Sequence, residues 1–311
     1  MKVRVPPVKC QGIKTKLVPW ILSNAIFPKD GFWIEPFMGS GVVGFNAYPE
    51  RAVFNDLNPH IINFYKAIQD NLITPSTARK YLSAEGERLK QKGDEYFYRV
   101  RERFNQYHDP LDFLFLSRAS FNGMIRFNSK GEYNVPFCKK RERFSKAYIT
   151  KIVNQIAHIW RLLQIFDWEF RCGDFEEIIL MATSNDFIYC DPPYYGRHID
   201  YYDKWDEAEE NRLFRLLNNT PARFILSTWH SNKYRKNSAL DKYQEKFFIT
   251  TKEHFYHIGA QEKNRNSILE ALVMNYPPPV PTVEQSARQL AFFEDRASYS
   301  ISAFSGEENS S

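Results

Sequence analysis

Four adjacent residues, Asp191-Pro192-Pro193-Tyr194, bring an acid, two prolines and an aromatic ring together. They follow an apolar run at 187–190 that predicts a buried strand. The prolines lack N–H groups, so the strand must end there, at the sheet edge where open α/β proteins bind ligands. The acid and a proline carbonyl would accept both N–H bonds of an exocyclic amine, while the ring stacks on a flat base. The motif predicts chemistry on such an amine, and the alternative is a simple turn after a strand.

A second candidate site is the glycine-rich stretch at 31–44, which reads as a strand, a turn and the start of a helix. Gly39 and Gly41 let the backbone turn sharply and approach a ligand closely. Asp56 follows 17 residues after Gly39, where an acid can hydrogen-bond ribose hydroxyls. With Gly44 the turn also fits a dinucleotide fingerprint, and a strand–helix turn without a ligand fits as well. A nicotinamide enzyme is the least favoured alternative, because it has no evident use for the acid–proline motif.

Two shorter elements extend this site. The run Lys9-Cys10-Gln11-Gly12-Ile13-Lys14 places a lysine near a glycine turn, where it can pair with a carboxylate; alone it is only a basic loop. The run Arg171-Cys172-Gly173-Asp174-Phe175 lies about one strand before Asp191. Asp174 can face a ligand, or it can cap a helix that begins with Glu176 and Glu177.

A basic, polar stretch at 117–146 is the candidate for binding a polyanion. Turns at Asn122-Gly123 and at Lys130-Gly131 predict a protruding hairpin. Eight Lys or Arg residues stand against two Glu residues in 118–146, with Lys139-Lys140-Arg141 at one end. Such a patch neutralises phosphates, and interleaved rings can stack on bases. The alternative is a solvated basic loop.

These residues need a sheet to position them, and the pattern predicts one in two parts. Residues 1–70 and 165–276 alternate strand-like and helix-like stretches, which is typical of a mostly parallel sheet with helices. We expect strands at 32–35, 52–55, 187–190, 224–227 and 268–274, and helices at 59–70 and 207–218. Between the two parts, residues 72–165 are helical, charged and rich in aromatic residues, which indicates an inserted domain. Four prolines at 277–281 form a stiff linker.

Composition limits the classes of protein that this chain can be. Its 311 residues carry a formal net charge of +5, of which the segment 277–311 contributes −3 and the rest +8. A basic body favours a polyanionic partner. The four cysteines form no CxxC pair, so we expect reduced thiols and neither a disulfide framework nor a metal site. Because no apolar run approaches 18 residues and no signal-peptide pattern is present, we expect no membrane partner and a cytoplasmic location.

Taken in order, these motifs resemble the Dam-like, or alpha-group, DNA adenine-N6 methyltransferases. The lysine motif, the FxGxG element at 37–41, the ribose acid, a long insert and the acid–proline motif occur in that group's order over residues 5–276. The resemblance implies an α/β fold: a Rossmann-like, S-adenosylmethionine-dependent methyltransferase sheet with an inserted helical and hairpin target-recognition domain. The catalytic domain would comprise 1–71 and 166–276 and the recognition domain 72–165, followed by a Pro-rich linker and flexible tail at 277–311.

The resemblance also implies roles for individual residues. The catalytic residues would be Asp191, Pro192, Pro193 and Tyr194. The residues that hold S-adenosylmethionine would be Cys10, Gly12, Lys14, Glu35, Pro36, Phe37, Gly39, Gly41, Asp56, Asp174, Phe175 and Asp191. The DNA-binding residues would be Asn122, Arg126, Lys130, Lys139, Lys140 and Arg141. Arg126 would contact a guanine edge, and Asn122 would line the space left by a flipped adenine. Where family members often have an aromatic residue and a second glycine, this chain has Cys10 and Ile13.

The implied activity is site-specific methylation of adenine N6 in double-stranded DNA, in a restriction–modification system or as a phage or orphan enzyme. One alternative is methylation of another planar amine, cytosine N4 or an RNA adenine. A second is a non-catalytic DNA-binding protein on the same fold. A cognate restriction endonuclease would be one partner. The run Gln289-Leu290-Ala291-Phe292-Phe293 resembles the motif by which bacterial DNA enzymes hold the sliding clamp, although a helix docked on the chain's own surface is the alternative.

Overall fold

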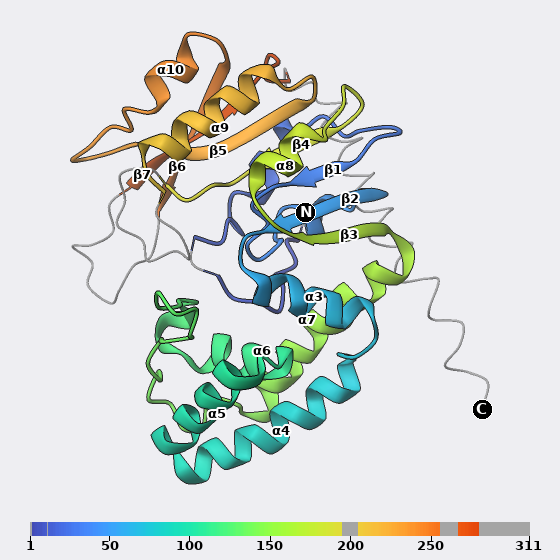
Figure 1. The fold of residues 1–311 in the computed structure, drawn as a ribbon, viewed down its shortest axis with the longest axis vertical. Coiled ribbons are helices and arrows are strands. Elements are labelled where there is room, and N and C mark those ends of the chain that lie inside the picture. Colours follow the sequence, from blue (N-terminus) through green and yellow to red (C-terminus); the bar gives the residue numbers. More distant parts are fainter. Residues whose placement is uncertain (1, 11, 195–204, 256–266, 280–311) are drawn as a thin grey trace.

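The computed structural model describes residues 2–10, 12–194, 205–255 and 267–279, which contain a seven-stranded sheet with helices on both faces (Figure 1). The strand order is β3-β2-β1-β4-β5-β7-β6. The first five strands along the chain run parallel, and β7 runs antiparallel to β5 and β6. The strands are β1 (Trp33–Glu35), β2 (Arg51–Asp56), β3 (Asp167–Cys172), β4 (Phe187–Cys190), β5 (Arg223–Asn232), β6 (Phe248–Phe255) and β7 (Ser267–Met274). The predicted α/β class is confirmed.

The order of the strands reverses between β1 and β4. From β1 the chain proceeds outward to β2 and β3, and it then returns to the other side of β1 to form β4 and β5. The connections that leave β1 and β4 therefore diverge, and the gap at their carboxyl ends is where open sheets bind ligands. Because Glu35 ends β1 and Cys190 ends β4, the glycine-rich turn and Asp191 both enter this gap.

Alternating side chains divide the core between the two faces of the sheet. On one face Trp33 and Phe54 pack with α1 (Val18–Asn24), α3 (Pro59–Gln69) and α7 (Lys146–Ile165). On the other face Ile34 and Val53 pack with α8 (Phe175–Leu180), α9 (Glu207–Asn219) and α10 (Leu240–Gln244). All four residues of β4 are buried, which explains the continuous apolar run before Asp191.

The sequence pattern does not predict β3 and β6, and each has a physical reason. Buried Trp168 and Phe170 alternate in β3 with more exposed charged residues, which are depleted in strands and hide the pattern. At the edge of the sheet, β6 pairs with β7 through a run that includes Thr250, Lys252 and Glu253. β6 is therefore stabilised by its pairing with β7, although its own residues do not show a strand pattern.

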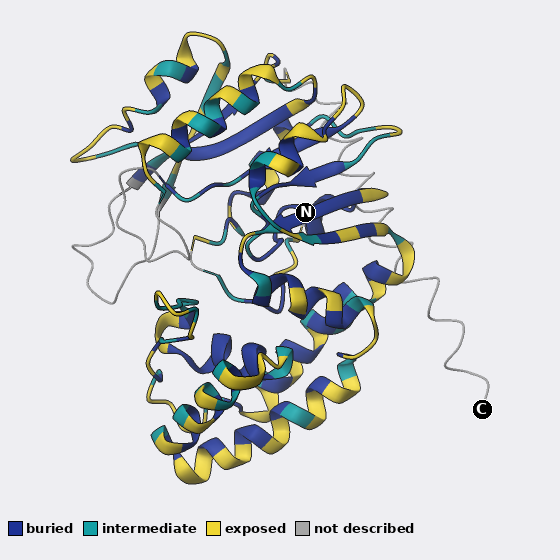
Figure 2. Cartoon of the chain, in the orientation of Figure 1, coloured by how far each residue is buried: buried dark blue, intermediate teal, exposed yellow. Residues whose placement is uncertain are grey.

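The insert forms a layer of helices, α4 (Pro75–Lys92), α5 (Asp94–Tyr107), α6 (Pro110–Ala119) and α7, below the sheet in Figure 1. Side chains of Thr74, Asp109 and Ser145 accept backbone N–H bonds at the starts of α4, α6 and α7, so local sequence fixes these boundaries. Along these helices, buried residues on the inner face alternate with exposed residues on the outer face (Figure 2). The inner faces belong to the hydrophobic cluster that covers one face of the sheet, so the core is continuous. The domain division at 72 and 165 stays a prediction.

Between α6 and α7 the chain forms the predicted Lys130-Gly131 turn, but the segments on either side of it make few strand-like contacts. A 3₁₀ turn, η1 (Phe121–Gly123), follows α6, and isolated antiparallel bridges join Ser120 to Phe137 and Phe127 to Tyr133. The Gly131 N–H donates to the Asn128 carbonyl at 2.9 Å, and Gly131 has a φ of +75°. The hairpin is therefore a loop closed by two bridges, with its tip at 128–131.

Candidate active site and DNA-binding surface

Asp191 lies directly after β4, and its carboxylate pairs with Lys14. Lys14 Nζ is 2.9 Å from Asp191 Oδ1, and the lysine side chain is 4% exposed. Burial raises the pKa of Asp191, and the Lys14 ammonium opposes that shift. The ammonium also lies 4.4 Å from the centroid of the Tyr194 ring. The structure thus joins the first and last motifs of the predicted site through an ion pair that the sequence did not predict.

Residues of two neighbouring strands hold Tyr194. Its hydroxyl donates to Oε2 of Glu270 at 2.5 Å, and Glu270 on β7 is fully buried. Tyr194 also packs in a small apolar cluster with Trp229 of β5 and Ile268 of β7. A ring fixed in this way has already lost rotamer freedom, which lowers the entropy cost of stacking another ring on it.

The glycine-rich turn after β1 is bonded to the end of β2. The Met38 N–H donates to the Asn55 carbonyl at 2.7 Å, and the Gly39 N–H donates to Asp56 Oδ2 at 2.8 Å. Asp56 Oδ1 accepts the Asn58 N–H at 2.9 Å, and burial raises the pKa of Asp56. Gly39 has a φ of +49°, and a Cβ added there would meet no atom within 4 Å. The turn therefore combines an acid with open space beside a backbone that only glycine adopts easily.

Two buried polar side chains brace this turn. Asn55 Nδ2 donates to the carbonyls of Pro36 at 3.0 Å and Gly173 at 2.9 Å, so it ties the two motif loops together. Asn55 Oδ1 is buried and accepts no hydrogen bond from the described residues. The Trp33 indole donates to Glu35 Oε1 at 2.9 Å, and burial raises the pKa of Glu35 to about 8. Asn55 Oδ1 is thus an unsatisfied buried acceptor next to the turn, a feature that a ligand with its own donors could satisfy.

Asp174 confirms the helix-cap alternative, because its Oδ1 accepts the Glu176 N–H at 2.7 Å at the start of α8. The same oxygen bonds the guanidinium of Arg212 from α9, whose carbon lies 4.3 Å from the Phe175 ring centroid. Phe175 packs against Phe37 with ring centroids 5.1 Å apart. This carboxylate already has partners, so a role for Asp174 toward a cofactor stays a prediction.

The N-terminal segment links the active site to the helical layer. Arg118 of α6 is 4% exposed and its Nε donates to the Pro7 carbonyl at 2.8 Å. Two residues on, Lys9 Nζ donates to the Asn122 carbonyl at 3.1 Å. Cys10 is partly buried, and burial raises the pKa of its thiol. Gly12 has a φ of +73°, so the turn before Lys14 needs glycine.

The predicted DNA-binding residues lie on the surface between α6 and α7. Arg126 Nε donates to Asn134 Oδ1 at 2.8 Å across the loop. Asn122 is exposed with a φ of +53°, beside Phe121, which is 51% exposed. Lys130 is exposed at the tip, where its N–H donates to Asn128 Oδ1 at 2.9 Å. Asn122 and Lys130 are thus exposed on the loop between α6 and α7.

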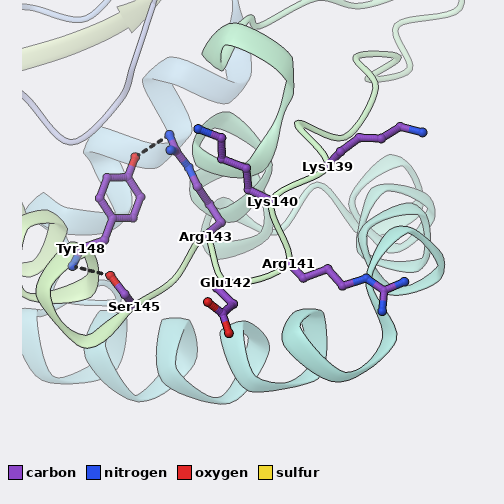
Figure 3. Close-up of a pocket in the computed structure, with 7 residues that line it drawn as sticks. All are labelled: Lys139, Lys140, Arg141, Glu142, Arg143, Ser145 and Tyr148. Atoms are coloured by element: carbon purple, nitrogen blue, oxygen red, sulfur yellow. Dashed lines mark hydrogen bonds between the residues drawn. The ribbon is translucent and has the colours of Figure 1, made fainter.

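The three remaining predicted DNA-binding residues line one basic hollow of about 640 Å³ before α7 (Figure 3). Arg143 braces it: Nε donates to the Arg118 carbonyl at 2.7 Å, and a terminal nitrogen donates to the Tyr148 hydroxyl at 3.0 Å. Lys139 Nζ lies 3.7 Å from Asp94, an exposed ion pair that contributes little. The residues that line the hollow are Lys139, Lys140, Arg141, Glu142, Arg143, Ser145 and Tyr148.

Several residues of these surfaces were missed by the sequence reasoning. The signal for Glu270 was an acid inside the apolar run at 268–274. The signal for Lys9 was its place in the same motif as Lys14. Arg212 carried no signal, because its contact with Asp174 depends on how α9 packs. Within the described residues, no group of three or more His, Cys, Asp or Glu side chains could hold a metal ion, and no helix is long and apolar enough to cross a membrane.

Comparison with known proteins decides the family. Residues 11–258 match the family described as "D12 class N6 adenine-specific DNA methyltransferase". The chain belongs to this family. The Dam-like resemblance is therefore confirmed.

The curated relatives are similar in sequence and differ in length. The chain is 28% identical to "Type II methyltransferase M.FokI" from Planomicrobium okeanokoites, across 87% of this chain and 42% of that protein. It therefore spans less than half of that relative's length. It is 27% identical to "Type II methyltransferase M.MjaIII" from Methanocaldococcus jannaschii, across 87% of this chain and 99% of that protein. It is 32% identical to a "DNA adenine methylase" from Haemophilus influenzae, across 61% of this chain and 63% of that protein.

Proposed function

We propose that this D12-class chain is a site-specific DNA adenine-N6 methyltransferase that uses S-adenosylmethionine and extrudes its target base. One observation carries the proposal: the Lys14–Asp191 pair stands at the carboxyl end of β4, beside the open glycine turn at the end of β1. A partly buried acid at the switch point of an open sheet suits a reaction between two bound ligands.

The residues of the glycine turn fit the cofactor. Asp56 would accept ribose hydroxyls through lone pairs that Gly39 and Asn58 leave unused. Asn55 Oδ1 is a further buried acceptor. The other predicted contacts, Cys10, Gly12, Lys14, Glu35, Pro36, Phe37, Gly41, Asp174 and Phe175, belong to the segments that surround this turn. When bound, S-adenosylmethionine supplies an activated methyl group on sulfur.

The residues around Asp191 would make the adenine amine reactive. The lone pair of N6 is delocalised into the ring, which makes this nitrogen a weak nucleophile. Asp191 and the Pro192 carbonyl would accept its two N–H bonds and free the lone pair, and Pro193 would keep the loop rigid. Lys14 would keep Asp191 ionised and occupy one oxygen, leaving the other for the amine. Tyr194 would stack on the extruded base.

The surface between α6 and α7 would bind the duplex. The fork of Arg126 suits the O6 and N7 acceptors of guanine. Asn122 and the exposed Phe121 would occupy the space from which adenine is extruded. Lys130, Lys139, Lys140 and Arg141 would neutralise phosphates. The hollow before α7 then acts as part of a phosphate-binding surface.

Finer assignments follow from this proposal. Methylation by a Type II relative suggests a restriction–modification partner, in which a cognate endonuclease cleaves unmodified sites. The clamp-binding run from Gln289 to Phe293 lies outside the described residues and stays a proposal. A cytoplasmic location suits an enzyme that acts on DNA with S-adenosylmethionine.

Methyl transfer from tritiated S-adenosylmethionine to four substrates tests the proposal. The substrates are genomic DNA, total RNA, and matched duplexes that contain or lack adenine. We expect label in DNA and in the adenine duplex, recovered as N6-methyladenine. Label recovered as N4-methylcytosine, or label confined to RNA, would replace the proposed substrate, and no transfer with DNA binding intact would favour a non-catalytic DNA-binding protein.

A further inference from the structure

The turn that follows β5 displays a tyrosine among three cations. Between Phe224 and Leu240 the chain contains no Asp or Glu, whereas Lys233, Arg235 and Lys236 fall within four residues. All three are exposed, and Tyr234 between them is 71% exposed. The charge and the ring serve no role in the active site described above.

Sheet geometry places this turn near the catalytic edge. Cys190, the last residue of β4, pairs with Leu226, and β5 continues six residues farther to Asn232. At about 3.3 Å per residue, the turn lies up to about 20 Å beyond the end of β4, and on the same carboxyl side of the sheet as Asp191. In Figure 1 it is the orange turn at the far left, on the side toward which the green loop between α6 and α7 also projects.

The strand order sets the two surfaces on opposite sides of Asp191. β5 lies on one side of β4, whereas β2 and β3, which flank the helical insert in the chain, lie on the other. DNA that is held by the insert and presents a base to Asp191 would continue past β4 toward β5. Because the turn lies up to about 20 Å from the end of β4, the duplex that it could reach extends at most about six base pairs from the target base, at 3.4 Å per base pair.

Two asparagines fix the backbone of the turn. Asn232 Oδ1 accepts the N–H groups of Tyr234 at 2.8 Å and Arg235 at 2.9 Å. At its base, Asn237 is 2% exposed, and its Nδ2 donates to the Trp229 carbonyl at 2.9 Å. Trp229 packs against Tyr194, so the turn is anchored on the apolar cluster that holds Tyr194. Exposed cations on a fixed backbone lose less entropy on binding than cations on a mobile loop.

We propose that the turn at 232–236 is a second DNA-binding element, which contacts phosphates of the duplex within about six base pairs of the target adenine, on the side away from the helical insert. The inference rests on the proposed function. Lys233 and Arg235 bind phosphates, and Tyr234 packs against the sugar–phosphate backbone. Lys236 Nζ already pairs with Asp241 Oδ1 at 3.4 Å, so Lys233 and Arg235 carry the proposed phosphate contacts. Two exposed cations on a turn that contains no acid fit a polyanion better than a protein surface, which is usually of mixed charge.

The experiment compares two charge-matched double variants on one 30-base-pair duplex. The turn variant is Lys233→Gln with Arg235→Gln. The control is Lys29→Gln with Arg223→Gln, which removes two exposed cations near the amino ends of β1 and β5. Fluorescence anisotropy gives the dissociation constant at several salt concentrations, hydroxyl-radical footprinting locates the contacts, and thermal melting checks folding.

The turn variant should lower the slope of log K against log salt by about 2, because each cation that binds a phosphate contributes about 1. It should also lose protection on one flank of the target. The control should keep the wild-type slope and footprint. Tyr234→Ala should weaken binding without changing the slope, because a neutral ring releases no counterions.

If the turn variant has the same slope and footprint as the control, the inference is overturned. The turn would then be a candidate for binding an acidic protein surface instead of DNA. Methyl transfer by the wild type on the same duplex is measured in parallel. Absence of wild-type transfer would count against the proposed function, whereas an unaltered turn variant beside normal wild-type transfer would count against the turn alone.

Discussion

The sheet edge and the loop between α6 and α7 both carry charged residues, but the two regions differ in how exposed those charges are. At the edge, the charges are buried or partly buried and paired inside the chain: buried Lys14 with partly buried Asp191, and partly buried Asp56 with backbone N–H groups. Between α6 and α7, Lys130 and Lys139 are exposed, and the Lys139 pair with Asp94 is long. Buried charges hold a geometry before any ligand arrives, whereas exposed charges await a partner that carries the opposite sign.

This difference predicts two kinds of variant. A buried charge that loses its partner is costly, about 3–5 kcal/mol, and it disturbs the reacting groups directly. An exposed charge contributes at most about 1 kcal/mol to stability, and its removal changes binding and salt dependence instead. Variants at the edge should therefore reduce rate or cofactor affinity, and variants of the loop should change DNA affinity or sequence preference.

The largest effect is expected at Asp191. Asp191→Ala and Asp191→Asn should each lower the methyl-transfer rate by roughly 10²–10³, by analogy with loss of one positioned partner of a reacting group. The alanine variant should also melt lower, because the buried Lys14 ammonium loses its carboxylate, whereas the asparagine variant keeps an acceptor. Single-turnover kinetics measures the rate. Asp167→Ala, an exposed acid on β3, is the control, and a wild-type rate in Asp191→Asn would break the assignment.

The next effect concerns the cofactor. Asp56→Ala should weaken S-adenosylmethionine binding at least tenfold, because charge-assisted hydrogen bonds contribute about 1.5–3 kcal/mol each. Asp174→Asn keeps a cap acceptor for α8 while removing the charge, so it separates a cofactor role from a structural one. Calorimetric titration measures both. Unchanged affinity in Asp56→Ala would remove the ribose role from this acid.

A smaller change in selectivity is expected from the loop. Arg126→Ala should reduce discrimination at one base pair by about 1–3 kcal/mol. Replacing Lys139, Lys140 and Arg141 with Gln should weaken binding to all duplexes alike and flatten the salt dependence. Competition binding with single-base substituted duplexes distinguishes the two patterns. If both variants lose affinity uniformly, Arg126 binds backbone rather than a base.

A pH-dependent effect on stability, on the order of 1 kcal/mol per pH unit, is expected from Glu35, whose pKa burial raises to about 8. Between the unfolded pKa of about 4.5 and the folded pKa, the unfolded chain loses this proton while the folded chain keeps it, so rising pH destabilises the wild type. Glu35→Gln removes that term. Its stability relative to the wild type should therefore grow from about pH 4.5 to 8 and then level off. Denaturant unfolding measures this difference, with a substitution of the exposed Glu50, Glu50→Gln, as a control. A Glu35→Gln difference that does not change with pH would refute the shift.

The sequence predicted local features better than distant contacts. The apolar run before Asp191 gave β4 with its observed bounds, and the Asp174 cap was weighed in advance, because both depend on adjacent residues. The sequence did not predict β3, because its buried tryptophan and phenylalanine alternate with charged residues. The bonds from Lys14 to Asp191 and from Tyr194 to Glu270 join residues far apart in the chain, and only the packing of the sheet determines them.

The central claim is that the paired acid at the end of β4 serves methylation of adenine N6 in DNA. The most direct test is sequencing of modified bases in DNA from cells that express the wild type or Asp191→Asn, in a host that lacks adenine methylation. The account predicts N6-methyladenine in one recurrent sequence context with the wild type and none with the variant. Equal N6-methyladenine from both proteins, or modification only at cytosine, would contradict it.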